Sequence, residues 1–243
     1  MERVKFQGIR QIVRFNWHLY AGAVGAVLIL LLFHWWWAAW LVVAPTLVSL
    51  LVSLYVYDLS GLYGLEWLPG VERGCIVNIH AGFDETSGLL ARKYAGCEVV
   101  VCDFYNRSKH TELSIAQARK AFPPYPGTQR IGSGQVPLAM DSADMIYLIF
   151  AAHEIRADEE RERFFRELCR VAKPGGRIVV VEHLRDWRNF LAYTAGCGHF
   201  LPAAVWKRTF GAAALKILEE KWVNAFVRMY VLGRDEAGCV AVG

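Results

Sequence analysis

The fold of this chain is decided between residues 141 and 183, which read DSADMIYLIFAAHEI over 141–155, FFRELCRVAKPGG over 164–176 and RIVVVEH over 177–183. The apolar run at 145–151 predicts a buried central strand. Apolar residues recur at helical spacing through 158–172 and predict an amphipathic helix. The KPGG sequence at 173–176 ends that helix, because proline cannot continue it and glycine permits a left-handed cap. The run at 177–182 then predicts a second buried strand.

The alternation of apolar strands and helices continues on both sides of this stretch. Further strands are predicted at 75–80, 98–103, 128–131, 215–222 and 226–233, and further helices at 85–94, 112–121, 189–200 and 206–214. Such an alternation indicates an α/β fold with a parallel sheet covered on both faces. The last two strands follow each other closely and predict an antiparallel hairpin. Ligands of such sheets bind beyond the carboxyl ends of the strands.

The N-terminal part of the chain is uncharged over a length that favours membrane insertion. No Asp, Glu, Lys or Arg occurs between Arg14 and Asp58. As a helix this stretch would be roughly 60 Å long, about twice the hydrocarbon core of a bilayer. We therefore expect residues 1–57 to form a membrane anchor with two transmembrane helices, 58–73 a connector and 74–243 the catalytic domain. A hairpin within one leaflet and helices packed on the domain are the alternatives.

Charged residues beside the anchor predict its orientation. Arg3, Lys5, Arg10 and Arg14 precede the first apolar run, and the turn between the runs carries only His34. By the positive-inside rule, the N-terminus and the catalytic domain are cytoplasmic, in a multi-pass protein of the cell membrane. Six cysteines without metal spacing agree with a reducing compartment. The net charge of +4 is partly explained by the membrane flank, so we expect no nucleic-acid partner.

From residue 74 to about 233 the chain resembles class I S-adenosylmethionine-dependent methyltransferases, above all in the stretch 141–183 quoted above. The nearest branch includes quinone and small-molecule methyltransferases. The resemblance implies a Rossmann-like, mostly parallel sheet with an antiparallel C-terminal strand, and S-adenosylmethionine as cofactor. The glycine loop departs from the family pattern of an acidic residue followed by Gly-x-Gly-x-Gly, because residues 78–84 read NIHAGFD with Gly82 as the one glycine. Missing glycines predict a constricted or reshaped loop.

The same resemblance assigns the cofactor site by position. Asp103 ends the second strand, where an acidic residue usually accepts hydrogen bonds from the ribose hydroxyls, although a strand-end Asp can also cap a turn. Tyr105 stands where family members stack a side chain on adenine. The implied cofactor-binding residues are Asn78, His80, Ala81, Gly82, Asp103, Phe104, Tyr105, Ser133, Gln135 and Phe150.

Histidines and carboxylates at the ends of two central strands are the candidates for chemistry. Methyl transfer mainly needs donor and nucleophile in line, but an amine, thiol or phenol acceptor also needs a base. His153, Glu154 and His183 are the predicted catalytic residues, with His80, Glu182 and His199 as further candidates. No short metal motif occurs, so no metal is predicted. A mixed shell from His80, Asp84, Asp103, His153, Glu154 and His183 is the alternative.

Three functions are compatible with these residues. The leading one is methyl transfer to a lipidic or membrane-partitioned acceptor, because an anchor beside the bilayer raises the local concentration of such a substrate. Membrane lipids and a small hydrophobic acceptor are then the expected partners. The second is a reaction of the rhodoquinone-biosynthesis type, whose family has a similar domain with an altered glycine loop and transfers an amino group from S-adenosylmethionine. The third is a non-catalytic membrane scaffold with a degenerate cofactor site.

Overall fold

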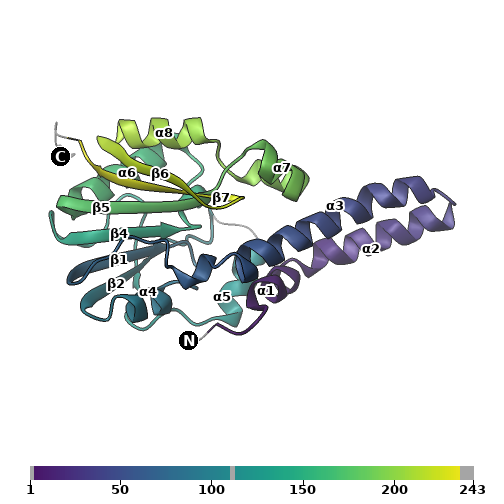
Figure 1. Cartoon of the computed structure of the whole chain (residues 1–243), viewed down its shortest axis with the longest axis horizontal. Helices are drawn as coiled ribbons and strands as arrows, with labels where there is room; N and C mark the ends of the chain where they lie inside the picture. The colour runs from purple at the N-terminus through teal and green to yellow at the C-terminus, as the bar shows by residue number, and fades with distance from the viewer. Residues whose placement is uncertain (1–2, 110–112, 236–243) are drawn as a thin grey trace.

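The computed structural model describes residues 3–109 and 113–235, which contain one seven-stranded sheet of order β3-β2-β1-β4-β5-β7-β6 (Figure 1). The strands are β1 (Gly74–His80), β2 (Cys97–Asp103), β3 (Gln129–Arg130), β4 (Ala143–Ile149), β5 (Ala172–His183), β6 (Leu215–Asn224) and β7 (Val227–Arg234). Strands β1 to β5 pair in parallel, whereas β7 runs antiparallel to both β5 and β6. The predicted Rossmann-like sheet with a reversed C-terminal strand is confirmed.

One face of the sheet is covered by α6 (Asp158–Val171) and α8 (Ala203–Ala212). The apolar stripe predicted on α6 is buried, with Phe164 and Phe165 at 0% exposure. The ring of Phe165 packs edge-on against that of Phe210 in α8, with ring centroids 5.2 Å apart. Each such buried side chain contributes about 1.5–3 kcal/mol relative to exposure, so this face fixes β4 and β5 firmly.

The opposite face is covered by α4 (Ser87–Lys93) and by the connector. Leu62, Leu65 and Leu68 of the connector are buried in one cluster with Leu90 of α4 and with residues of β1, β4 and β5. The connector is thus part of the core of the domain. Because the connector follows directly after the N-terminal helices, it links the position of these helices to that of the sheet.

Some element boundaries differ from the predicted ones. Strand β5 begins at Ala172 because this residue pairs with Ala143 ahead of a register shift in β4, so the KPGG turn lies within the strand. The helix predicted at 189–200 is divided into α7 (Trp187–Tyr193) and a 3₁₀ turn (Thr194–His199). The helix α5 (Leu113–Ala121) matches its prediction, although Glu112 lies outside the described residues, as do residues 236–243 of the domain.

The anchor consists of α1 (Gln7–Phe15), α2 (Trp17–Leu32) and α3 (Trp36–Leu54), followed by a π-helical turn (Tyr55–Leu59). Helices α2 and α3 form a hairpin that projects from the domain (Figure 1). The continuous helical segment Trp36–Gly64 is long and apolar enough to cross a membrane. In contrast to the predicted first span, α1 and α2 reach that length only together, and they meet at an angle of 71°. By length, the described residues therefore support one span and a bent pair.

Candidate functional site

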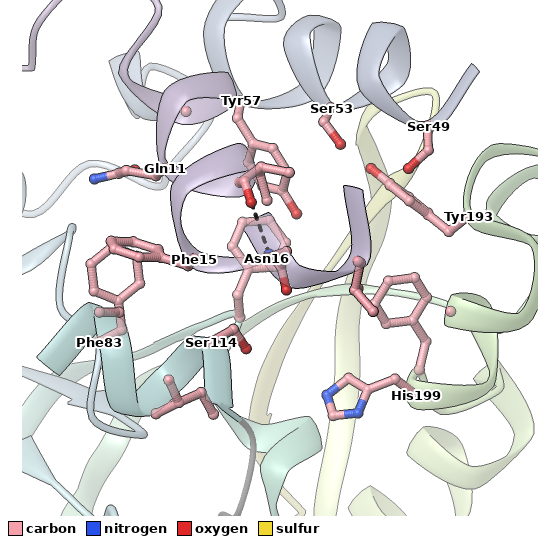
Figure 2. Close-up of a pocket in the computed structure, with 18 of the residues that line it drawn as sticks. Gln11, Phe15, Asn16, Ser49, Ser53, Tyr57, Phe83, Ser114, Tyr193 and His199 are labelled. Carbon is pink, nitrogen blue, oxygen red and sulfur yellow. Dashed lines mark hydrogen bonds between the residues drawn. The ribbon is translucent and has the colours of Figure 1, made fainter. Parts of the chain in front are cut away.

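A cavity of about 650 Å³ lies between the N-terminal helices and the carboxyl ends of β1 and β4, and we call it the hairpin cavity. In Figure 2, Ser49 and Ser53 of α3 face the same space as Tyr193 and His199 of the domain. The volume falls within the range of about 300–1,000 Å³ typical of small-molecule sites. Of the predicted site residues, four line it: Ala81, Phe150, His153 and Glu154.

A cluster of two histidines and two carboxylates, here called the His–Glu cluster, forms one end of the hairpin cavity. It consists of His153, Glu154, Glu182 and His199. The Nε2 atoms of His153 and His199 lie 3.4 and 3.5 Å from Oε1 of Glu154. Glu182, which is 1% exposed, lies behind the cluster, with its Oε2 2.7 Å from Nδ1 of His153. The backbone N–H of His153 also donates to Glu182, at 3.2 Å.

The charges of the His–Glu cluster depend on one another. Burial would lower the pKa of His153, but the carboxylates of Glu182 and Glu154 outweigh burial and raise this pKa to about 10. Burial would raise the pKa of Glu154, but hydrogen bonds from His153 and His199 hold it well below its ordinary value. Glu154 is therefore ionised at neutral pH.

His199 enters the cluster because the chain turns sharply after α7. Thr194 has a φ of 49°, a left-handed conformation that is uncommon for a threonine. The helix therefore stops at Tyr193, and the 3₁₀ turn that follows carries His199 back over Glu154. Sequence analysis named His199 only as a further candidate, because its position depends on this backbone turn.

His183 lies behind the hairpin cavity in a separate buried network. Its Nδ1 is 3.1 Å from both Oδ1 of Asn189 and the backbone oxygen of Phe226. Both partners are acceptors, so Nδ1 carries the proton, and Nε2 accepts a hydrogen bond from the hydroxyl of Tyr57 at 2.9 Å. Burial lowers the pKa of His183 to about 4. This geometry suits a neutral histidine that holds Tyr57, and with it the C-terminal end of the anchor, against the sheet.

Residues predicted to bind the nucleoside gather at the ends of β1 and β2. Nδ1 of His80 accepts a hydrogen bond from the N–H of Gly82 at 3.1 Å and lies 3.7 Å from Oδ1 of Asp103. Oδ2 of Asp103 accepts a hydrogen bond from Arg119 of α5 at 2.6 Å, and Oδ1 accepts one from the N–H of Tyr105 at 2.9 Å. The carboxylate that the family uses for ribose therefore already has protein donors.

The loop after β1 is closely packed, as the missing glycines predict. Gly82 has a φ of 98°, and a Cβ there would lie 2.8 Å from Arg119 and 2.9 Å from Tyr105. Asn78 donates to the hydroxyls of Thr86 and Ser87, at 3.0 and 2.7 Å. This buried asparagine thus ties β1 to the start of α4. Neighbouring Asp84 accepts hydrogen bonds from the N–H groups of the same two residues, which caps α4 as expected for a residue of this type.

The other predicted cofactor residues lie apart from these two groups. Phe104 is 3% exposed and its ring packs 5.5 Å from that of Phe164. Ser133 donates to Glu160 at the start of α6, and Gln135 is exposed. The ring of Phe150 stacks on His183 at 5.2 Å, so it forms a wall between His183 and the hairpin cavity.

Glu85 fastens α1 to the loop after β1. Its Oε1 accepts hydrogen bonds from Arg3 at 2.8 Å and Gln7 at 3.2 Å, and its Oε2 accepts one from Tyr63 at 2.8 Å. The guanidinium of Arg3 also lies over the ring of Tyr63. No local sequence signal links these residues, because they come from three segments that only the folded chain brings together.

Comparison with known proteins identifies the class of the domain. A family model described as a methyltransferase domain matches residues 79–180. None of the curated proteins searched matches the chain. A solved S-adenosylmethionine-dependent methyltransferase from Aquifex aeolicus is similar, with 15% identity, a TM-score of 0.52, and coverage of 77% of this chain and 97% of that one.

Two further solved structures share the fold. One is an S-adenosylmethionine-dependent methyltransferase from Methanosarcina mazei, with 16% identity, a TM-score of 0.50, and coverage of 69% of this chain and 95% of that one. The other is the [4+2]-cyclase SpnF, with 13% identity, a TM-score of 0.53, and coverage of 73% of this chain and 80% of that one. Residues 79–180 thus match a methyltransferase domain, and the domain has the fold of S-adenosylmethionine-dependent methyltransferases, which implies S-adenosylmethionine as the cofactor.

The residues at the predicted cofactor position fit one half of S-adenosylmethionine better than the other. Beyond β1 and β4 there is room, and two buried atoms, Nε2 of Gln11 and Nε2 of His80, have no hydrogen-bond partner among the residues that the structure describes. Beside β2, Asp103 is at the position for ribose, but Arg119 must leave it before ribose hydroxyls can take its place. At the predicted cofactor position there is thus space beyond β1 and β4, whereas the predicted ribose acceptor Asp103 is occupied by the Arg119 side chain.

Proposed function

We propose that the protein transfers a methyl group from S-adenosylmethionine to a lipidic or membrane-partitioned acceptor, such as a lipid amine, a quinone, or a hydrophobic thiol or phenol. The observation that carries this proposal is the hairpin cavity. Its roof is built by α1 together with the apolar helices α2 and α3, and its floor by the strand ends at which cofactors of this fold bind. An acceptor with an apolar tail can enter along the helices and bring its polar end to the His–Glu cluster.

The residues around the hairpin cavity suit this reaction. S-adenosylmethionine supplies an activated methyl group on a sulfonium centre. Hydroxyl groups such as those of Ser49 and Tyr193 give the upper part of the cavity polar contacts. Glu154 is ionised and lies between two imidazoles, so it can accept a hydrogen bond from the hydroxyl or amine of the acceptor. These contacts would hold the acceptor in line with the methyl group.

Exposed apolar side chains support a position at the membrane for the whole protein. The hairpin exposes Leu32, Phe33 and Trp36, and α7 next to α3 exposes Trp187 and Phe190. A monomeric soluble protein rarely exposes so much contiguous apolar surface. We propose that α2 and α3 cross the membrane as a multi-pass anchor, that α7 rests in the interface, and that the N-terminus and the domain are cytoplasmic.

Labelled S-adenosylmethionine and a membrane lipid extract test the proposed reaction. The full-length protein in nanodiscs is expected to transfer label to one lipid fraction and to release S-adenosylhomocysteine. Ser49→Phe, which fills the hairpin cavity from α3, should abolish transfer and leave cofactor binding unchanged in calorimetry. Leu51→Phe adds a similar ring to the exposed side of the same helix and should leave transfer intact.

Other outcomes of this experiment separate the competing functions. Product formation without S-adenosylhomocysteine would favour a reaction of the rhodoquinone-biosynthesis type. Failure of a demonstrably folded protein to bind S-adenosylmethionine would favour a membrane scaffold. Equal transfer by Ser49→Phe and the parent protein would disprove the entry of the acceptor through the hairpin cavity.

A further inference from the structure

Three side chains of the His–Glu cluster converge on one point at the end of the hairpin cavity. The ligand-type atoms of His153, Glu154 and His199 all lie within 4.8 Å of one another. We propose that these residues bind a divalent transition-metal ion, through Nε2 of each histidine and a carboxylate oxygen of Glu154. Sequence analysis predicts no metal and, as the alternative, a shell without His199, so this site comes from the fold.

The separations between these atoms match a metal site. Metal bonds of 2.0–2.1 Å to nitrogen and oxygen, arranged tetrahedrally, place neighbouring ligand atoms about 3.4 Å apart. The two observed separations from Oε1 of Glu154, to the Nε2 atoms of His153 and His199, are 3.4 and 3.5 Å. The two rings meet edge to face, with centroids 4.9 Å apart and an interplanar angle of 85°. The three donors could therefore close around an ion with small side-chain movements.

Glu182 provides the second layer that such sites use. Metal-binding histidines usually donate their other ring N–H to a carboxylate, which fixes the tautomer and the ring orientation. Oε2 of Glu182 lies 2.7 Å from Nδ1 of His153, so that Nε2, on the side of the ring that faces Glu154, is the nitrogen available to an ion. Glu182 also accepts from the backbone N–H of His153, so both the ring and its backbone are held in place. We treat Glu182 as a positioning residue.

The charge of the cluster agrees with a dication. Glu154 and Glu182 place two carboxyl groups in a site where Glu182 is 1% and Glu154 9% exposed. Buried charges require compensation by opposite charge. A divalent ion bound to the two neutral imidazoles would supply two positive charges at one position. Two imidazoles with one carboxylate are a donor set that suits zinc, iron and related ions, rather than magnesium or calcium.

Three protein ligands leave a further position on the ion open toward the hairpin cavity. Given the proposed function, this position suits a hydroxyl or phenol oxygen of the acceptor. A bound hydroxyl would have a lowered pKa there, so that its proton would pass to water at the open side of the cavity and its oxygen would remain as the nucleophile. The oxygen then forms the bond to the methyl carbon as the sulfur–methyl bond breaks, with its electron pair left on sulfur.

Metal binding can be measured without acceptor or cofactor, so its failure is distinguishable from failure of the proposed function. The full-length protein in detergent is stripped with chelator and titrated with Zn²⁺ in calorimetry, and then with Co²⁺ for visible absorption. We expect one saturable site per chain and a cobalt spectrum of low-coordinate nitrogen and oxygen ligation. Zinc should also raise the melting temperature of the parent protein.

Variants of the cluster decide the assignment. His199→Ala is expected to fold, because His199 lies on a partly exposed turn, and to lose the saturable site, the cobalt spectrum and the thermal shift. Glu182→Gln should weaken zinc binding by about 10- to 100-fold. His34→Ala removes a histidine at the exposed tip of the hairpin and should change nothing. Absence of a saturable site in the parent protein, or equal binding by His199→Ala, would overturn the proposal in favour of a proton-neutralised cluster.

Discussion

Arg119 competes with the nucleoside for the carboxylate of Asp103. The pair is close, at 2.6 Å, but the arginine side chain is 24% exposed and can move into solvent. A pair of this kind contributes about 1 kcal/mol, which corresponds to about a fivefold change in an equilibrium constant. Arg119→Gln is therefore expected to strengthen binding of S-adenosylmethionine by about fivefold in calorimetry. Lys120→Gln, at the exposed neighbouring position, serves as the control.

Asp103→Asn tests the other partner of the same pair. Loss of a charged acceptor costs about 1.5–3 kcal/mol per hydrogen bond, so cofactor binding should weaken by about 10- to 100-fold. An unchanged affinity in Asp103→Asn would show that ribose is held elsewhere. A weaker affinity in Arg119→Gln would instead make Arg119 a ligand of the cofactor.

His183 should make the folded protein sensitive to acid. Its pKa falls from 6.5 to about 4 because burial disfavours its charged form. Between these pH values the unfolded chain binds a proton that the folded chain does not, so stability is lost as the pH falls. The free energy of unfolding should decrease by up to about 1.4 kcal/mol per pH unit in this window. Chemical denaturation of the parent protein and of His183→Gln, which does not titrate there, should show a difference in slope. Parallel curves would mean that His183 keeps an ordinary pKa.

Position along a strand predicts where a side chain lies, but not what it contacts. His153, Asp103 and Asn78 were identifiable because each lies in or directly after an apolar run, at an edge known to bind ligands. The contact of Arg119 with Asp103 depends on how α5 is rotated above the sheet. The position of His199 depends on a left-handed threonine. Neither feature has a local sequence pattern, so the contacts that close the cofactor site and complete the His–Glu cluster required the structure.

At the scale of elements, α1 is held over the site by contacts from distant parts of the chain. Asp58 accepts hydrogen bonds from the N–H groups of Gly8 and Ile9, both at 2.8 Å, and so caps α1 from outside the helix. Gly8 permits this approach, because a Cβ there would lie 2.5 Å from Cβ of Tyr57. The C-terminal end of α1 packs through Phe15, whose ring lies 5.7 Å from that of Phe83 in the loop after β1. These contacts hold α1 in the wall of the hairpin cavity.

Asp58→Ala is expected to loosen α1. Loss of a helix cap costs about 0.5–2 kcal/mol, and here two backbone donors lose their acceptor together. Hydrogen exchange of the α1 amides should become faster, while exchange in β4 and β5 stays unchanged. Glu66→Gln alters an exposed carboxylate of the connector and should have no effect. Unchanged exchange in α1 of Asp58→Ala would mean that the aromatic contacts alone hold the helix.

The sheet elements were predictable because their apolar runs have no other place in a soluble domain than the core. The shape of the N-terminal helices was less predictable, because an uncharged stretch does not show where a helix bends. The break between α1 and α2 at Asn16 leaves α2 with 16 residues, and α1 turns away to cover the site. The N-terminal segment thus contains one helix, α1, that covers the cavity and a helix pair, α2 and α3, that projects from the domain.

At the scale of the whole molecule, the proposed membrane position rests on the hairpin and α7. The 19 residues of α3 span about 28 Å, close to the hydrocarbon thickness of about 30 Å. Because Ser49 and Ser53 of α3 also line the hairpin cavity, a full span places that cavity at the level of the lipid. Helix α2 is a few ångströms shorter, and it lies alongside α3 up to the tip of the hairpin (Figure 1). Lys5, Arg10 and Arg14 are exposed at the domain end, and the tip carries Trp35 and its neighbours. Indole prefers the interface, so the tip should reach the headgroups of the opposite leaflet.

This arrangement predicts on which side of the membrane the tip lies. His34 is exposed and has a φ of 59° in the turn between α2 and α3. In His34→Cys, a membrane-impermeant thiol reagent should label the protein from the side opposite to the domain in sealed vesicles of known orientation, and the parent protein under the same conditions sets the background. If the hairpin turned back within one leaflet, the thiol would lie in hydrocarbon and remain unlabelled from both sides. That result would exclude the multi-pass anchor. It would leave the hairpin cavity in place, because the polar end of the cavity is built by residues after β4 and after α7.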